Sequence, residues 1–140
     1  MAETFRCTIV TPAAAVFDAE VRYASFPAWD GQVGVLYGQS PQLTRLGIGP
    51  MRVDEAEGAS RWYLVEGGFA QVHENVLTIL TERATPAEEL SVSQAEAELK
   101  DANARAIAGG EDRVKVEADQ RRARSGRALA QAAGSGGQSH

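Results

Sequence analysis

Cysteine and long apolar runs are nearly absent from this chain of 140 residues. The one cysteine, Cys7, cannot form an intrachain disulfide, so a reducing compartment is the simpler assumption. No apolar run approaches the roughly 20 residues that span a bilayer. The first residues, Met-Ala-Glu-Thr-Phe-Arg, lack the basic and apolar regions of a signal peptide. We therefore expect any membrane association to pass through other proteins.

Basic charge is scarce as well, with 14 Lys and Arg against 19 Asp and Glu and a net charge of −5. Because phosphates repel an acidic surface, nucleic acid is not an expected partner. Of the two histidines, His73 lies beside a turn and His140 lies at the end of the chain. No nucleophile motif accompanies them, and no metal-ligand spacing appears. We expect no catalysis, no metal and no cofactor.

The composition changes sharply along the chain. All nine Phe, Trp and Tyr residues lie at or before Phe69, and the last of the five prolines is Pro86. Thirteen alanines and dense charge follow in residues 85–140. This is a change from strand-forming to helix-forming residues. The sequence therefore predicts an α+β chain with a β domain over residues 1–84, a helical hairpin over 85–133 and a disordered tail over 134–140.

Short strands with close turns dominate the first domain. Phe5, Cys7 and Ile9 alternate with outward positions, which indicates a strand in which Cys7 is a small buried hydrophobe. Residues 17–23 alternate in the same way. Two further strands meet at Gly67-Gly68, which predicts a turn or bulge; a phosphate cradle would need a following helix. Such a series of strands is typical of a sandwich or a barrel.

The first helix is predicted to begin at Ser91 or Ser93, although Thr85-Pro86-Ala87-Glu88 could also start it. The later start leaves an unbroken apolar stripe, formed by Val92, Ala95, Leu99, Ala102 and Ala106. Gly109-Gly110 should end this helix.

A second helix is predicted from about Asp112 to Ala133. Its apolar side consists of Val114, Ala118, Ser125, Leu129 and Ala132. The two helices should pair as an antiparallel hairpin. Their shared face is mostly alanine, which buries little area, and Gly126 costs about 1 kcal/mol more. We expect a marginal hairpin that is easily detached or extended.

Several glycine motifs occur in an order that resembles the epsilon subunit of F-type ATP synthases. They are Gly31-Gln-Val-Gly34-Val-Leu, Gly38-x-x-Pro41-x-Leu43-Thr44, Gly49-Pro-Met-Arg52-Val, Leu64 to Val72 with its Gly-Gly pair, and Asn75 to Leu80. Together they cover roughly two thirds of the chain. The resemblance implies an N-terminal antiparallel β-sandwich of about ten strands, followed by a C-terminal α-helical hairpin. It also implies docking on the gamma subunit and the membrane-embedded c-ring, as part of the central stalk.

The resemblance places the contacts with the c-ring and gamma in two loops. The matching residues are Gln32, Gly38, Gln39, Ser40, Pro41 and Gln42. The family's common acidic residue is replaced by Gln32, its histidine by Gln39 and its first loop leucine by Gln42. Neutral amides can still bond to the polar loops of a ring, so we expect a contact that is weaker or tuned to a different ring.

Some bacterial members of the family bind ATP on the hairpin through an Ile-Asp-x-x-Arg-Ala motif. Leu90 to Ala95 match this motif, with Ser91 at the aspartate and Gln94 at the arginine. Each charged hydrogen bond contributes roughly 1.5–3 kcal/mol. We therefore expect no useful nucleotide site.

Four arginines form the one basic cluster of note: Arg121, Arg122, Arg124 and Arg127. On a helix they make a broad positive flank. One interpretation is a solvated face balanced by Glu117 and Asp119. The other is docking on an acidic partner, because the resemblance implies a hairpin that extends to the catalytic alpha and beta subunits and inhibits ATP hydrolysis.

The resemblance therefore implies a non-catalytic rotor subunit of a proton-transporting ATP synthase, coupling proton flow to ATP synthesis. It would sit peripherally at the cytoplasmic face of the bacterial inner membrane, held there by partner subunits. The alternative is a free-standing β-sandwich binding module with a dimerising helical tail, which would need an exposed aromatic platform. An enzyme is the least favoured interpretation.

Overall fold

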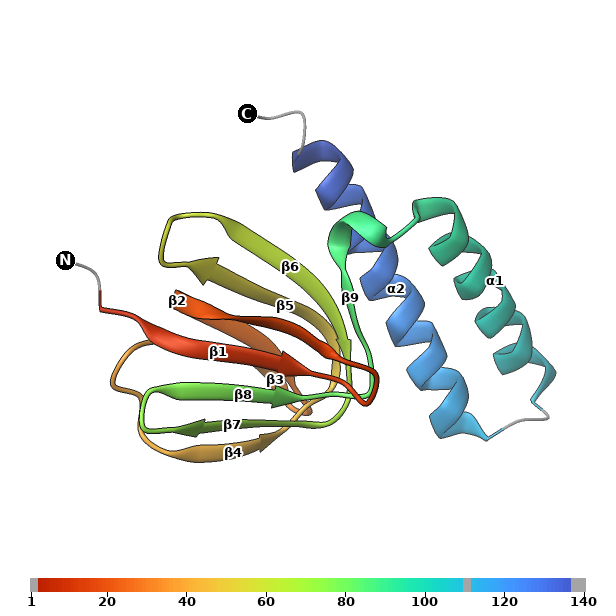
Figure 1. The fold of residues 1–140 in the computed structure, drawn as a ribbon. Helices are drawn as coiled ribbons and strands as arrows, with labels where there is room; N and C mark the ends of the chain where they lie inside the picture. The colour runs from red at the N-terminus through yellow and green to blue at the C-terminus, as the bar shows by residue number, and fades with distance from the viewer. Residues whose placement is uncertain (1–2, 110–111, 137–140) are drawn as a thin grey trace.

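The structure is a computed structural model and describes residues 3–109 and 112–136, which form nine strands followed by helices (Figure 1). The strands are β1 Phe5–Val10, β2 Ala15–Ala28, β3 Gly31–Val35, β4 Gln42–Arg45, β5 Ile48–Glu55, β6 Ser60–Glu66, β7 Phe69–His73, β8 Val76–Leu80 and β9 Ala84–Pro86. The helices are a 3-10 turn η1 Ala87–Glu89, α1 Val92–Ala108 and α2 Arg113–Gly136.

The strands form two packed layers that share β2. They are hydrogen-bonded in the order β4-β7-β8-β1-β2-β5-β6-β9, with β3 beside β2. The first half of β2 pairs with β1, and its second half pairs with β3 and β5. Only β1 and β8 run parallel among the paired strands of the described residues. The predicted antiparallel β-sandwich is confirmed, with this one parallel pair added.

The core follows the predicted alternation. Phe5, Cys7 and Ile9 are all buried on one face of β1. The largest side chains among the fully buried ones include Phe26 and Met51, which β2 and β5 direct into the same core. Each such residue contributes about 1.5–3 kcal/mol relative to an exposed position. The sandwich therefore carries most of the stability of the chain.

The Gly67-Gly68 pair connects two strands that do not pair with each other. β6 lies between β5 and β9, whereas β7 lies between β4 and β8, so the connection crosses from one layer to the other. Gly68 has φ 101°, and a Cβ there would overlap the carbonyl oxygen of Leu80. Only glycine fits this crossing without strain.

The last strand reaches beyond the predicted sandwich boundary. In β9, Thr85 pairs with Leu64 of β6, so a boundary between residues 84 and 85 would cut the strand. Thr85 therefore does not begin a helix. Ser91 caps α1 instead, since its hydroxyl accepts a hydrogen bond of 3.2 Å from the backbone N–H of Gln94. The prediction of a later helix start is confirmed.

The two helices form the predicted hairpin, and α2 lies between α1 and the sandwich (Figure 1). Gly109 ends α1 in the left-handed conformation with φ 72°, as predicted, and Gly110 lies outside the described residues. Neither helix, as far as the structure describes them, is long and apolar enough to cross a membrane.

The predicted apolar side of α2 is partly wrong. Leu129 is buried, but Val114 is 73% exposed, and Val116 and Ala123 are buried instead. The prediction assumed contact with α1 alone, whereas α2 also packs against the sandwich, which changes the side of the helix that is covered. The helix continues to Gly136, so residues 134–136 of the predicted tail are helical, and residues 137–140 lie outside the described part.

Candidate functional sites

Gln32 lies in β3, where the chain returns from the exposed turn at Trp29 and Asp30. Its side-chain Nε2 donates a hydrogen bond of 2.9 Å to the backbone carbonyl of Pro50. This bond fixes the amide nitrogen to β5, and the residue as a whole stays exposed. Gln32 is thus a neutral amide at the position where the family that the sequence resembles commonly has a carboxylate.

The loop from Gly38 to Gln42 follows the other end of β3. The backbone N–H of Gly38 donates a hydrogen bond of 2.9 Å to Asn75 Oδ1, which ties the loop to the β7–β8 turn. Gln39, Ser40 and Pro41 are exposed, whereas Gln42 is half-buried at the start of β4. The amide nitrogen of Gln42 is buried and has no hydrogen-bond partner among the described residues.

The two predicted docking segments are therefore not brought together. Gln32 is the second residue of β3, so the strand continues for three residues beyond it, about 10 Å at 3.3 Å per residue, before the chain turns into the loop. The backbone N–H of Trp29 bonds to the carbonyl of Arg45, at the far end of β4 from Gln42. Gln32 and the Gly38–Gln42 loop thus mark opposite ends of the sandwich.

Each of these ends carries large apolar side chains in exposed positions. Trp29 is 66% exposed close to Gln32, and Leu36 and Tyr37 are 58% and 46% exposed just before Gly38. Single exposed apolar residues are ordinary, but several of them grouped at a loop mark a contact surface. These residues were not among the predicted site residues, and the signal that could have found them is their position in or next to turns rather than in strands.

A third apolar surface covers the outer side of β4, β7 and β8. Phe69 is 50% exposed, Leu80 lies opposite it and is 51% exposed, and Leu43 is 70% exposed on the neighbouring strand. A shallow hollow of about 380 Å³ continues the surface past Val10 and Pro12. We call Leu43, Phe69 and Leu80 the outer apolar face.

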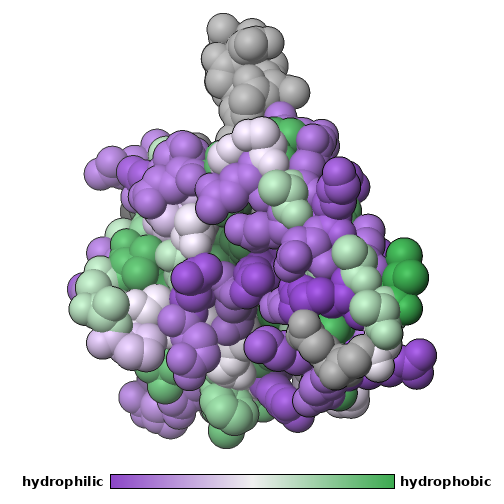
Figure 2. All heavy atoms as spheres, turned by 90° about the vertical axis from the view of Figure 1, so that its right-hand side faces the viewer, coloured by the Kyte–Doolittle hydropathy of each residue, from purple (hydrophilic) through white to green (hydrophobic). Residues whose placement is uncertain are grey.

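The hairpin presents a different kind of surface. Figure 2 views the molecule from the hairpin side and shows a largely hydrophilic surface with separate hydrophobic spots. Arg121 and Arg124 are exposed, and Arg127 is half-buried. Arg122 instead turns toward the sandwich, where its guanidinium lies 3.6 Å from Glu66 Oε1 and 3.3 Å from Asp119 Oδ1.

The arginine cluster is thus divided by the fold. Asp119 balances Arg122 and also receives Arg105 at 2.9 Å, while Glu117 lies 3.9 Å from Arg113. Neither acid forms an ion pair with Arg121 or Arg124 within the described part of the chain. The interpretation of a face balanced by nearby acids therefore holds for Arg122, which pairs with Asp119. Arg121 and Arg124 remain as unbalanced positive charge on the outer side of α2.

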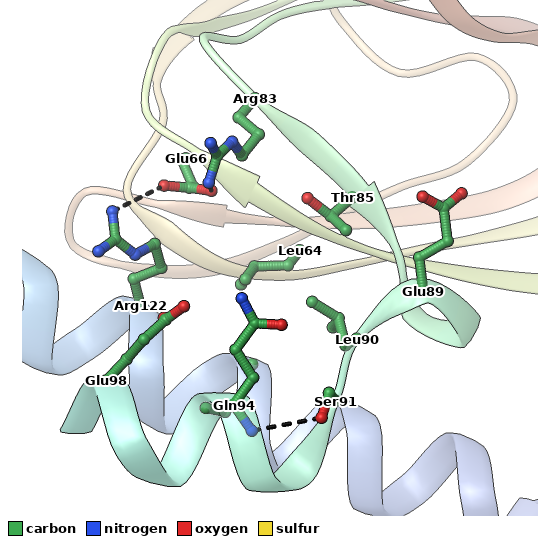
Figure 3. Close-up of a pocket in the computed structure, with 12 residues that line it drawn as sticks. Leu64, Glu66, Arg83, Thr85, Glu89, Leu90, Ser91, Gln94, Glu98 and Arg122 are labelled. Atoms are coloured by element: carbon green, nitrogen blue, oxygen red, sulfur yellow. Dashed lines mark hydrogen bonds and ion pairs between the residues drawn. The ribbon is translucent and has the colours of Figure 1, made fainter. Parts of the chain in front are cut away.

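A cleft of about 200 Å³ lies between the sandwich and the hairpin (Figure 3). Its charged lining consists of Glu66, Glu89, Glu98, Arg83 and Arg122. Three carboxylates against two guanidiniums give a net negative lining, which disfavours a polyanion.

Ser91 and Gln94 also line this cleft, so the structure brings the two motif positions to the place where a ligand could enter. The Ser91 hydroxyl is already used in capping α1. The serine therefore has a structural role that needs no ligand.

Groups with catalytic potential are few. Burial raises the pKa of the Cys7 thiol to about 12, which makes it unreactive. His73 is exposed and lies 3.8 Å from Glu74 Oε1. No group of three His, Cys, Asp or Glu side chains that could hold a metal occurs in residues 3–109 and 112–136.

Comparison with known proteins agrees with this architecture. A family model described as the beta-sandwich domain of the ATP synthase delta/epsilon chain matches residues 4–87. The chain is 39% identical over 99 residues to the ATP synthase epsilon chain of Rhodopirellula baltica, covering 71% of this chain and 77% of the relative. It is 38% identical over 132 residues to the epsilon chain of a Synechococcus strain, covering 93% of each.

Two solved assemblies contain chains of similar fold. A chain of the Euglena gracilis mitochondrial ATP synthase superposes with a TM-score of 0.80 at 24% identity, covering 89% of this chain and 80% of that one. A chain of the central stalk and c-ring of the Tetrahymena thermophila mitochondrial ATP synthase gives a TM-score of 0.52 at 20% identity, covering 62% and 69%. From the matched domain and these relatives, the chain belongs to the family of ATP synthase epsilon chains, which are accessory, non-catalytic subunits of the synthase.

Proposed function

We propose that the chain couples proton flow to ATP synthesis as a rotor subunit that docks on the gamma subunit and the c-ring. The observation that carries this proposal is the placement of exposed apolar residues at both ends of β3 and on the outer apolar face. An isolated domain gains nothing from such residues, whereas a subunit enclosed by partners buries them.

The two ends of the sandwich serve different contacts in this proposal. Gln32 with Trp29 forms one contact, and the Gly38–Gln42 loop with Tyr37 forms the other. Because the segments lie at opposite ends of β3, with about 10 Å of strand beyond Gln32, two partners can share them more easily than one flat surface can. The gamma subunit and the c-ring are those two partners.

The hairpin is the regulatory part of the proposal. In the structure it is folded on the sandwich, where its apolar contact rests mainly on Leu129 of α2 against Leu64 and Ala87. So small a contact allows folded and extended states to differ by a few kcal/mol, as a switch requires. In the extended state the hairpin would reach the catalytic alpha and beta subunits and inhibit ATP hydrolysis through Arg121, Arg122, Arg124 and Arg127.

The proposed location follows from the partners. The chain would sit at the cytoplasmic face of a bacterial inner membrane, bound only through gamma and the c-ring. No nucleotide is required for this role, and we propose that the cleft holds none.

The test is ATP hydrolysis by the purified synthase, with the full chain and with a chain that ends at Leu90. A stop at Arg83 would remove β9, whereas a stop at Leu90 keeps β9 and η1. Hydrolysis that rises severalfold with assembly intact supports an inhibitory hairpin. An unchanged rate would limit the chain to docking through its sandwich.

The rival, a free-standing module with a dimerising tail, is tested in the same preparation. The helical faces that would dimerise are already covered, because α1 and α2 pack on each other and α2 packs on the sandwich. Absence of the chain from the purified synthase, together with a dimer in ultracentrifugation, would replace the rotor proposal.

A further inference from the structure

Charges of alternating sign run from α1 through α2 to the sandwich. Asp101 pairs with Arg105 at 3.0 Å, and Arg105 pairs with Asp119 at 2.9 Å. Asp119 pairs with Arg122 at 3.3 Å, and Arg122 reaches Glu66 of β6 at 3.6 Å. The last contact joins the hairpin to the sandwich (Figure 3).

The three charges nearest the sandwich are too well covered to form ordinary surface ion pairs. The side chain of Glu66 is 13% exposed, that of Asp119 is 17% exposed, and that of Arg122 is 32% exposed. Salt screens covered pairs less than exposed ones, and leaving one partner alone in such a place is costly. The Arg122–Glu66 pair therefore contributes to the choice between docked and detached hairpin.

On the sandwich side of this pair, Glu66 is bonded to residues of the sandwich itself. The backbone N–H of Glu66 donates to the carbonyl of Arg83 at 3.0 Å and to Thr81 Oγ1 at 3.3 Å. Arg83 also lies 3.8 Å from Glu66 Oε2. These hydrogen bonds fix the backbone of Glu66 within the sandwich, so its position does not depend on α2, and Arg83 is the sandwich residue that pairs with its carboxylate.

The arginines of α2 differ in how accessible they are while the hairpin is docked on the sandwich. Arg121 and Arg124 face outward in the folded state, so a partner could reach them without any rearrangement. The guanidinium of Arg122 lies between Glu66 and Asp119, and it is freed from Glu66 when α2 leaves the sandwich.

We propose that the Arg122–Glu66 pair is an electrostatic latch that holds the hairpin folded without any bound ligand and withholds Arg122 from acidic partners until it opens. The first half concerns the isolated chain. The second half rests on the proposed function, because it needs a partner that the extended hairpin contacts.

The latch is tested on the full chain by the distance between the sandwich and the hairpin tip. Fluorophores are attached to the variants Glu57→Cys and Ile107→Cys, whose parent residues are exposed on the β5–β6 turn and on α1. Cys7 is fully buried and stays unlabelled. Single-molecule energy transfer then gives the ratio of detached to docked chains.

Glu66→Gln and Arg122→Gln should each raise this ratio about three- to tenfold, the effect of losing a partly buried ion pair. The double variant should go no further than either single one, because both remove the same contact. Arg124→Gln, on the same helix but exposed, is the matched control and should leave the ratio unchanged. Added NaCl should raise the ratio in the unsubstituted chain and have a smaller effect in Glu66→Gln.

Equal ratios in Arg122→Gln and Arg124→Gln, or additive effects of the two latch substitutions, would overturn the latch. Hydrogen exchange of the buried β1 amides checks that Glu66→Gln leaves the sandwich intact, and Arg122→Gln repeats the test from the helix side. Copurification with the synthase is scored separately. If the substitutions raise the ratio of detached to docked chains as expected but the chain does not copurify with the synthase, the latch is supported and the rotor role is rejected.

Discussion

Gly68 lies so close to the carbonyl oxygen of Leu80 that no side chain fits between them. This approach lets the chain leave β6 and enter the other layer at β7. The backbone of Gly68 is also in the left-handed region, with φ 101°. The lack of space for a Cβ and the left-handed backbone conformation thus both require glycine at position 68.

Gly68→Ala should therefore destabilise the sandwich by about 3 kcal/mol or more, the combined effect of strain and overlap with backbone. Gly58 is the matched control, because it has φ 107° but open space where a Cβ would stand. Gly58→Ala should cost only the conformational part, about 1 kcal/mol. Urea unfolding measures both, and equal losses would show that overlap at Leu80 does not matter.

At Gly126, in contrast to Gly68, a substitution by alanine is expected to stabilise the protein. A Cβ at this position would lie 3.6 Å from Leu64 Cδ2 and 3.9 Å from Ala95 Cβ, which are ordinary contact distances. Gly126→Ala should stabilise α2 by about 1 kcal/mol through helix propensity. Hydrogen exchange of α2 amides should slow accordingly, and Ala128→Gly at an exposed position should accelerate it by a similar factor. Faster exchange in Gly126→Ala would mean that the site cannot accept a methyl group.

The sequence predicted the fold well where one physical signal acted alone. Alternation placed Phe5, Cys7 and Ile9 in the core, and the apolar stripe placed the start of the first helix at Ser91 or Ser93, of which the structure has Ser91. It failed at Val114, because the covered side of α2 depends on two neighbours that no local pattern encodes. It also placed a boundary inside β9, a short strand held by pairing with β6 rather than by its own composition.

The candidate sites were harder to predict than the fold. The sequence grouped four arginines, yet only the tertiary contact with Glu66 separates Arg122 from its exposed neighbours. Glu66 precedes the Gly67-Gly68 turn in the sequence, and nothing near it indicates that an arginine 56 positions later will approach it. Long-range ion pairs of this kind leave no periodic trace in a single sequence.

Cys7 should behave as an inert hydrophobe. Burial raises the pKa of its thiol from 9.0 to about 12, so the folded state holds the proton more tightly than the unfolded state. Its contribution to stability is therefore complete below pH 9 and is lost as the pH rises toward 12. Compared with Cys7→Ala, the unsubstituted chain should lose stability more steeply across this range in denaturant titrations.

The same burial predicts labelling behaviour at neutral pH. A thiol reagent should modify Cys7 only as fast as the sandwich opens, so the rate should rise with urea and fall with stabilising substitutions. Rapid modification in native conditions would contradict the inert assignment.

Crosslinking separates the two docking segments. A photoreactive residue at Gln32 and another at Gln39 should form products with different subunits of the synthase, because β3 holds the positions at opposite ends of the sandwich. Mass spectrometry of the crosslinked complex identifies the partners. If both positions give the same main product, one partner covers both ends, and the division between gamma and the c-ring is wrong.

The cleft should bind no ATP at physiological concentrations. Ser91 and Gln94 stand where the resembling motif has an aspartate and an arginine, and two lost charged hydrogen bonds weaken binding by about 3–6 kcal/mol, or 10²–10⁴-fold. The net negative lining by Glu66, Glu89 and Glu98 adds repulsion that Arg83 and Arg122 do not cancel. Titration calorimetry with millimolar MgATP should give no saturable heat, and the same result with Glu98→Gln would show that one carboxylate is not the sole obstacle. Saturable binding by the unsubstituted chain would mean that backbone groups and the arginines suffice, and that the hairpin is held by a ligand as well as by its own ion pairs.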